Sequence, residues 1–264
     1  MKKLILILAS AAIFVPIIII LIASISTLAA YPELIPGQLT LRYWQNMIFR
    51  NSLFAESLVN SIIIGAVNGF LSGIVGMLTA RALVSHDWPG KKWLHHFSAI
   101  PLFVPAIALF MGVHVVLIRF QLINSLIGVV LAHMLVTIPY STNIFVAFFQ
   151  GIPVDLENAA RTLGCSRWAC FRKILLPLLL PGVWLAFSIG FLISFSEYFS
   201  TFLIGGGRVI TLAGLMYPFV SNSDTSNGAV LGVLFIVTNL AVFLIAERIS
   251  KSKIKVDNYL FGPS

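Results

Sequence analysis

The chain has 264 residues, of which 59% are apolar and 10% are charged. A soluble domain carries roughly 25% charged residues, so the composition excludes an ordinary soluble protein and indicates one membrane domain, for which lipid is the solvent. The net charge of +8 is typical of basic cytoplasmic loops, because the Lys and Arg residues lie between apolar runs and form no basic stripe of the kind that binds nucleic acid.

Six apolar runs are long enough to cross a bilayer, which takes roughly 20 helical residues. The sequence therefore predicts an all-α, polytopic membrane protein with about six transmembrane helices. The first run begins with Lys2 and Lys3, as a signal peptide does. Its apolar part exceeds the roughly 7–15 residues of a signal peptide, so we expect it to remain as a spanning helix. The predicted spans are residues 4–30, 57–84, 97–118, 123–149, 174–204 and 228–246.

The distribution of basic residues predicts the orientation. Most of the 17 Lys and Arg residues fall on the same side of the membrane as the N-terminus. Basic loops stay in the cytoplasm, so both termini are expected there. The predicted organisation is a first helix with an outer segment (1–52), a membrane core (53–250) and a cytoplasmic tail (251–264). The basic residues on the outer side are Arg42, Arg50, Arg119 and Arg208.

The longest predicted cytoplasmic loop, residues 151–173, has a helical pattern. Pro153 suits the first turn of a helix, Gly164 its end, and Ser166 the cap of a second helix. A short helix with a small-residue face fits a docking element. The alternative is an amphipathic helix on the lipid surface, which normally carries larger apolar residues and more Lys. The residues that share one face of the predicted helix are Leu156, Ala159, Ala160 and Leu163.

Two cysteines, Cys165 and Cys170, lie in this loop. A cytoplasmic position does not favour a disulfide between them. Two thiols without a nearby His or a further Cys do not make a zinc site. We therefore expect no metal site here.

The loop resembles the signature loop of type I, binding-protein-dependent ABC importer permeases. The family pattern is Glu-Ala-Ala, three residues, Gly, nine residues and Ile-x-Leu-Pro. Ala159, Ala160 and Gly164 match it, as do residues 174–177, but Asn158 stands at the position of the family's Glu. Asn keeps the size and hydrogen bonding of Glu but lacks its charge, so the docking contact is expected to differ.

The resemblance extends over residues 55–250. Asn60 and Ser61 open the second span as in the family, residues 100–105 resemble the start of its third span, and Pro139 fits its fourth. The resemblance implies a type I permease fold in the bacterial inner membrane. It also implies three kinds of partner besides membrane lipid: a cytoplasmic ABC ATPase dimer, a second permease subunit, and an outer solute-binding protein.

The resemblance implies a coupling role for the loop, which would seat in a groove of the ATPase. The chain has no Walker A motif, so we expect it not to be an enzyme and to bind no cofactor, with ATP and Mg²⁺ used by the partner. It has one signature loop, so a second permease chain is needed. We expect that chain to be a paralogue rather than a second copy of this one. The expected ATPase-coupling residues are Glu157, Asn158, Ala159, Ala160, Arg161 and Gly164.

Polar residues inside predicted spans are candidates for the solute pathway, because they are costly in lipid. Glu197 is the clearest, and Ser194 and Thr201 are expected on the same helical face. Glu197 could attract a cationic substrate, or it could have a structural or gating role. His114 and His133 are further candidates, although a single His in a span more often makes a helix–helix contact. Asparagines predicted to join helices are Asn60, Asn68, Asn124 and Asn143.

The segment from Tyr198 to Leu212 resembles the subgroup of these permeases that handles polyamines, thiamine, ferric iron or phosphonates. A polyamine is our preferred substrate hypothesis, partly because of Glu197. Two other functions stay open at this point. An ion-gradient-driven transporter would need coupling-ion sites and usually internal repeats, and no repeat is evident. A non-transporting membrane scaffold would not require the full spaced signature.

Overall fold

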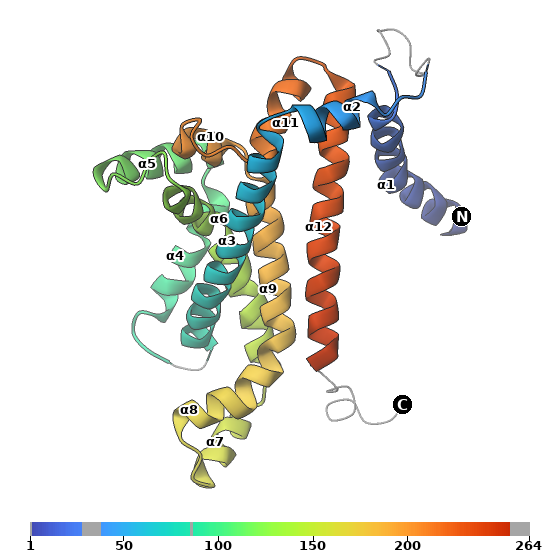
Figure 1. Cartoon of the computed structure of the whole chain (residues 1–264). Coiled ribbons are helices and arrows are strands. Elements are labelled where there is room, and N and C mark those ends of the chain that lie inside the picture. The colour runs from blue at the N-terminus through green and yellow to red at the C-terminus, as the bar shows by residue number, and fades with distance from the viewer. Residues whose placement is uncertain (1, 28–37, 85–86, 254–264) are drawn as a thin grey trace.

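The computed structural model describes residues 2–27, 38–84 and 87–253, and Figure 1 shows that this part of the chain is almost entirely helical. Within it, an isolated bridge between Ser26 and Leu39 is the single strand-like pairing. The all-α prediction is confirmed. The long helices are α1 (Lys2–Ser24), α3 (Phe54–Val84), α6 (Leu126–Gln150), α9 (Leu176–Ser196) and α12 (Thr225–Lys253). The shorter helices are α2 (Arg42–Gln45), α4 (Lys91–Phe103), α5 (Ala106–Arg119), α7 (Val154–Thr162), α8 (Arg167–Cys170), α10 (Phe199–Gly205) and α11 (Leu212–Ser221), with π-helical turns at Asn46–Arg50 and Phe171–Leu175.

Four helices of the described chain are long and apolar enough to cross a membrane. They are Phe54–Val84, Leu126–Gln150, the continuous helix Arg167–Ser196, and Thr225–Ile249. These confirm the second, fourth, fifth and sixth predicted spans as membrane-length helices. The first predicted span is represented by α1, whose stretch Phe14–Ser24 is a shorter apolar helix, so its crossing stays a prediction.

The third predicted span, 97–118, is not one straight helix. It is divided into α4 and α5, which meet at 111°. Val104 is extended, with φ −85° and ψ 133°, and Pro105 follows it. A proline disfavours the helical conformation in the residue before it and has no N–H to donate, so α4 ends there. The prediction of a continuous helix was wrong because the apolar run hid this stop signal.

The core of the bundle is formed by α3, α6 and α9, which pack on one another more extensively than any other helices. The face of α3 that they bury is made mostly of small residues. A Cβ added at Gly69 would lie 2.7 Å from the Phe187 carbonyl oxygen of α9, and one at Gly76 would lie 2.5 Å from Ser141 Cβ of α6. Lipid offers no hydrophobic drive between helices, so such close backbone approach is what holds them together.

We expect Gly76→Ala to destabilise the bundle by about 1–3 kcal/mol, because the added methyl overpacks the α3–α6 contact. Gly73→Ala is the matched control, since Gly73 lies one turn away with nothing within 4 Å of an added Cβ. That control should be neutral or stabilise by roughly 0.5–1 kcal/mol through helix propensity. Thermal unfolding of the two purified variants in detergent measures the difference. Equal melting temperatures would contradict the packing argument.

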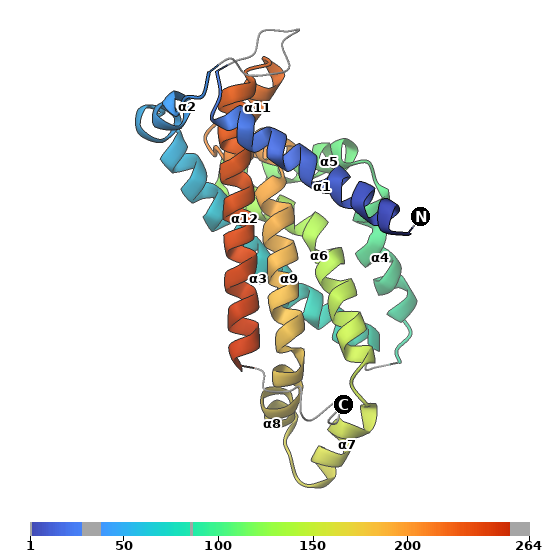
Figure 2. The same cartoon turned by 90° about the vertical axis from the view of Figure 1, so that its right-hand side faces the viewer.

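The two ends of the bundle differ. Figures 1 and 2 show α7 and α8 projecting beyond the ends of α3, α6 and α12, whereas α2, α10 and α11 lie at the opposite end. We call the first of these the loop end and the second the far end. The C-terminal part of α12 points to the loop end.

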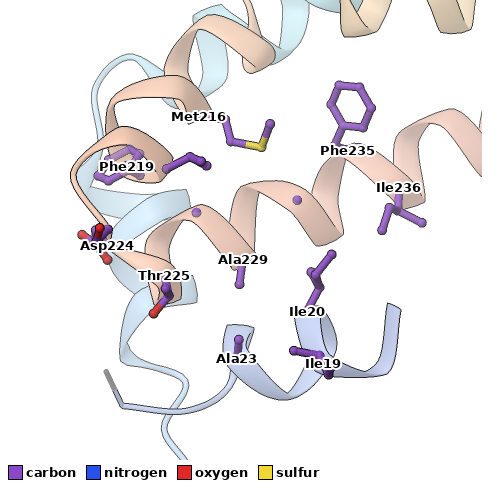
Figure 3. Close-up of a pocket in the computed structure, with 14 residues that line it drawn as sticks. Ile19, Ile20, Ala23, Met216, Phe219, Asp224, Thr225, Ala229, Phe235 and Ile236 are labelled. Carbon is purple, nitrogen blue, oxygen red and sulfur yellow. The ribbon is translucent and has the colours of Figure 1, made fainter. Parts of the chain in front are cut away.

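The helix α1 is attached to the bundle through α12. The Ser226 hydroxyl donates to the Ser26 carbonyl oxygen at 3.0 Å, which ties the end of α1 to the start of α12. Between α1, α11 and α12 the packing leaves a mostly apolar cavity of about 500 Å³, with Ile20, Phe219 and Phe235 among its walls (Figure 3). The three-helix core therefore does not include α1.

Candidate functional site

The loop 151–173 folds as the sequence predicts, into a short helix, a glycine stop and a second helix. Pro153 precedes α7. Gly164 has φ +85°; its N–H donates to the Arg161 carbonyl at 3.0 Å, and the Cys165 N–H donates to the Ala160 carbonyl at 3.1 Å. This pair of bonds is the Schellman arrangement, in which a left-handed residue ends the helix and satisfies its last carbonyls. Glycine adopts that conformation without the steric cost that a Cβ brings.

The second helix of the loop begins at the predicted cap. The Ser166 hydroxyl accepts from the Ala169 N–H at 3.3 Å. From α8 the chain continues through a π-helical turn into α9, so that Arg167–Ser196 forms one helix. The loop is therefore joined directly to the bundle core. Cys165 and Cys170 are both free thiols.

An ion pair fixes α7 to the end of α3. Arg81 Nη2 lies 3.2 Å from Glu157 Oε1, and both side chains are about a quarter exposed. The Arg81 guanidinium also lies over the Phe171 ring, 5.4 Å from its centroid. Arg81 therefore contacts both α7 and the turn that leads into α9, across 76 positions of sequence in the case of Glu157. No pattern in the sequence indicates this pairing.

The remaining expected coupling residues face outward. Asn158, Ala159, Arg161 and Gly164 are exposed, and Ala160 is half-buried. Two large apolar side chains at the tip are also exposed, Leu163 at 89% and Trp168 at 69%. Large apolar side chains exposed outside the spanning helices are candidates for an interaction site.

The Arg81–Glu157 pair should be measurable as local stability of α7. Arg81→Gln and Glu157→Gln should each speed trypsin cleavage after Arg161 and Arg167 roughly two- to fivefold, because a partly exposed ion pair contributes about 0.2–1 kcal/mol. The double variant should cleave little faster than either single variant, since both remove the same interaction.

Asp155→Asn is the control for the cleavage measurement, because Asp155 lies in the same first turn without a salt bridge in the described structure. It should speed cleavage less than Glu157→Gln, which loses the ion pair as well as a first-turn carboxylate. Additive effects of the two variants of the pair would show that Arg81 and Glu157 act independently.

The bundle core contains a second candidate group, centred on His133 of α6. His133 Nδ1 lies 2.7 Å from Ser194 Oγ, and Nε2 lies 3.0 Å from Thr201 Oγ1. Thr201 also donates to the Glu197 carbonyl oxygen at 3.0 Å. A hydroxyl has one proton, so Thr201 accepts from Nε2–H, and Nδ1 accepts from Ser194. His133 thus joins α6 to α9 and α10 as a fully satisfied side chain.

Glu197 does not lie inside a continuous helix, contrary to the prediction. The helix α9 ends at Ser196, and Glu197 is extended with ψ 104°. Its Oε1 accepts from the Ser200 N–H at 3.3 Å in the first turn of α10. A carboxylate that satisfies free N–H groups at a helix start is a reason for the chain to break here. The expectation that Ser194, Glu197 and Thr201 share one helical face was therefore wrong, although Ser194 and Thr201 do meet at His133.

The other polar residues of the spans have different positions. His114 is half-buried in α5, beyond the bend of the third span, and no hydrogen bond of the described structure joins it to the His133 group. Asn68 Nδ2 donates to the Gly190 carbonyl oxygen at 3.1 Å and its Oδ1 accepts from Thr137 at 3.1 Å. Asn60 Nδ2 donates to the Ile210 carbonyl oxygen at 3.1 Å. These two asparagines join helices or their loops as predicted.

Comparison with known families now decides the identity of the chain. The family model described as "Binding-protein-dependent transport system inner membrane component" matches residues 72–255, well over half of the sequence. The chain belongs to this family. It is a permease subunit of the type I ABC importer class and not an enzyme, because ATP hydrolysis is carried out by a separate subunit.

Relatives with different named substrates are similar to the chain. It is 25% identical over 240 residues to a protein named as the 2-aminoethylphosphonate transport permease PhnV of Salmonella typhimurium, covering 90% of this chain and 89% of that protein. It is 26% identical over 211 residues to the spermidine/putrescine permease PotC of Haemophilus influenzae, covering 79% and 81%. The trehalose permease SugB of Mycobacterium tuberculosis is 30% identical over 165 residues, 62% and 60% of the two chains.

Solved structures share the fold. A chain of a bacterial alginate ABC transporter, solved with an alginate-bound periplasmic protein, superposes with a TM-score of 0.72 at 13% identity, covering 96% of this chain and 94% of that one. A chain of the MetNI methionine ABC transporter superposes with a TM-score of 0.64 at 17% identity, covering 77% and 97%. The family description, a binding-protein-dependent transport system, implies a solute-binding protein as a partner of its members.

Proposed function

We propose that this permease forms a solute pathway together with a second permease chain, a paralogue, and that α7 couples the pathway to the cytoplasmic ATPase. The observation that carries the proposal is the geometry of the loop. The unit of α7, Gly164 and α8 stands free at the loop end, is anchored to α3 by Arg81, and continues as one helix into the core. A free docking face on a rigid stem is what a coupling element requires.

In this proposal the coupling face consists of the outward residues of α7 and its stop, with ATP and Mg²⁺ bound by the partner ATPase and not by this chain. The loop end lies in the cytoplasm of a bacterial cell, with both termini on that side. The direction of α12, whose C-terminal part points to the loop end, supports this orientation. The proposed coupling residues are Glu157, Asn158, Ala159, Ala160, Arg161 and Gly164.

For the substrate we propose a small organic cation such as a polyamine. Thr201, which bonds to His133, also lines a cavity of about 570 Å³ at the far end. Tyr198 and Tyr217 stack in its wall with ring centroids 4.3 Å apart. Aromatic faces attract cations, and Glu197 precedes Tyr198 in the chain. The polyamine permease among the relatives supports the same class.

The coupling proposal predicts that the ATPase co-purifies with the tagged chain in mild detergent, and that the glycine stop matters. Gly164→Val should lower ATPase recovery about tenfold, because a β-branched residue at positive φ costs roughly 1–3 kcal/mol or displaces the end of α7. Gly164→Asn is the control, since Asn tolerates this conformation. Equal membrane levels of the three proteins establish that insertion is unaffected. Full ATPase recovery with Gly164→Val would show that the glycine stop has no role in coupling.

A separate prediction concerns the pathway. Glu197→Gln keeps a side-chain oxygen for the Ser200 N–H but removes the charge, so uptake of labelled putrescine should show KM raised roughly tenfold, since a charged hydrogen bond contributes about 1.5–3 kcal/mol. Glu56→Gln, an exposed acid in the first turn of α3, is the control. Uptake of 2-aminoethylphosphonate and trehalose tests the other classes. An unchanged KM would show that the charge of Glu197 does not contribute to substrate binding and that its role is structural.

A further inference from the structure

A polar cavity of about 380 Å³ lies at the root of α7. The end of α3, the end of α6, α7 and the start of α8 supply its walls. Its charged and polar lining consists of Arg81, Glu157, Asn158, Arg161 and Arg167. Guanidinium groups therefore come from three separate helices, and one carboxylate faces them.

That carboxylate is already paired. Glu157 Oε1 lies 3.2 Å from Arg81, whereas no salt bridge of the described residues involves Arg161 or Arg167. Asn158 adds no charge at the position where the family has Glu. Lys91 at this end is compensated, because it lies 2.8 Å from Asp87 and lowers the pKa of that carboxyl by hydrogen bonding and by its charge. The cavity thus retains positive charge that no salt bridge of the described residues compensates.

Two exposed apolar side chains, Leu163 and Trp168, lie within two residues of the lining residues Arg161 and Arg167 in the chain. Leu163 ends α7, and Trp168 in α8 is mostly exposed and stacks on Phe171 with ring centroids 5.9 Å apart. Trp and Arg are the residues that most often dominate the energy of a protein interface. Since α7 and α8 project beyond the ends of the spanning helices (Figures 1 and 2), this surface faces a protein in the cytoplasm more readily than lipid.

We propose that an acidic side chain of the ATPase enters this cavity and pairs with Arg161 and Arg167, with Leu163 and Trp168 packing around it. The inference rests on the proposed coupling function and adds the polarity of the contact: positive on the permease, negative on the ATPase. A guanidinium pair binds a carboxylate in defined geometry. Asn158 fits this arrangement because a carboxylate at its position would repel the incoming acid.

The test is charge reversal, read as the amount of ATPase that co-purifies with the tagged chain. Arg161→Glu combined with Arg167→Glu should lower recovery roughly tenfold or more, because attraction becomes repulsion at close range. Arg161→Lys combined with Arg167→Lys should retain much of it. Lys92→Glu, at an exposed basic residue of α4, is the control for a general loss of positive charge and should leave recovery unchanged.

Asn158→Glu distinguishes a basic ATPase groove from an acidic one, because the two change ATPase recovery in opposite directions. This variant restores the family's Glu, and it should raise ATPase recovery if the groove of the ATPase is basic. Our proposal requires the reverse, a recovery lowered about threefold or more by one added repulsive charge. Recovery equal to or above that of the unchanged chain overturns the proposed polarity.

A carbodiimide, which joins amines to carboxylates, locates the partner of the cavity in the double Lys variant. The expected product links an introduced amine to an Asp or Glu of the ATPase. If the reversal variant keeps full ATPase recovery but loses binding to vesicles containing phosphatidylglycerol, the cavity serves an anionic lipid and the proposal is wrong. If the unchanged chain recovers no ATPase, the proposed coupling function itself fails, which is a distinct outcome.

Discussion

The close approach of α3 to α6 and α9 is the contact on which the rest of the structure depends. Lipid solvates an apolar helix as well as another helix does, so the spans associate through van der Waals packing and a few polar contacts. Gly69 and Gly76 bring the backbones together, and Asn68 bonds to both neighbouring helices. The same three helices carry the parts of the loop end: Arg81 lies in the last turn of α3, α6 leads into α7, and α8 continues into α9. The position of the proposed docking face therefore follows from the packing of the core.

Features set by local chemistry could be predicted from the sequence. An apolar run of sufficient length indicates a spanning helix wherever it lies, and four such helices are present in the described chain. The loop 151–173 is equally local: Gly164 ends α7 with φ +85°, and Ser166 caps α8. The glycine stop and the serine cap each depend on residues fewer than six positions apart, so that neighbours in the sequence are also neighbours in space.

Features set by contacts between distant segments could not be predicted. Arg81 and Glu157 meet only because α6 returns the chain to the end of α3, and Ser194 and Thr201 meet at His133 only once α9 packs on α6. The two breaks in the spans are an intermediate case. Pro105 was visible but stood inside an apolar run, whereas at Glu197 the signal was a carboxylate that caps the following helix. A hydropathy pattern reveals neither of these two breaks.

Under the proposed function, the break at Glu197 also explains how a single chain can connect the loop end with the cavity at the far end. Arg167–Ser196 is one helix, so a displacement of α8 is carried along a rigid stem to Ser194. The helix ends near that point, and hydrogen bonds continue the connection. Ser194 bonds to His133, and His133 bonds to Thr201 in the wall of the far cavity. Small displacements at packed helices are transmitted because such contacts do not deform continuously. A straight helix through Glu197 would extend the stem but would remove the turn that places Thr201 beside His133.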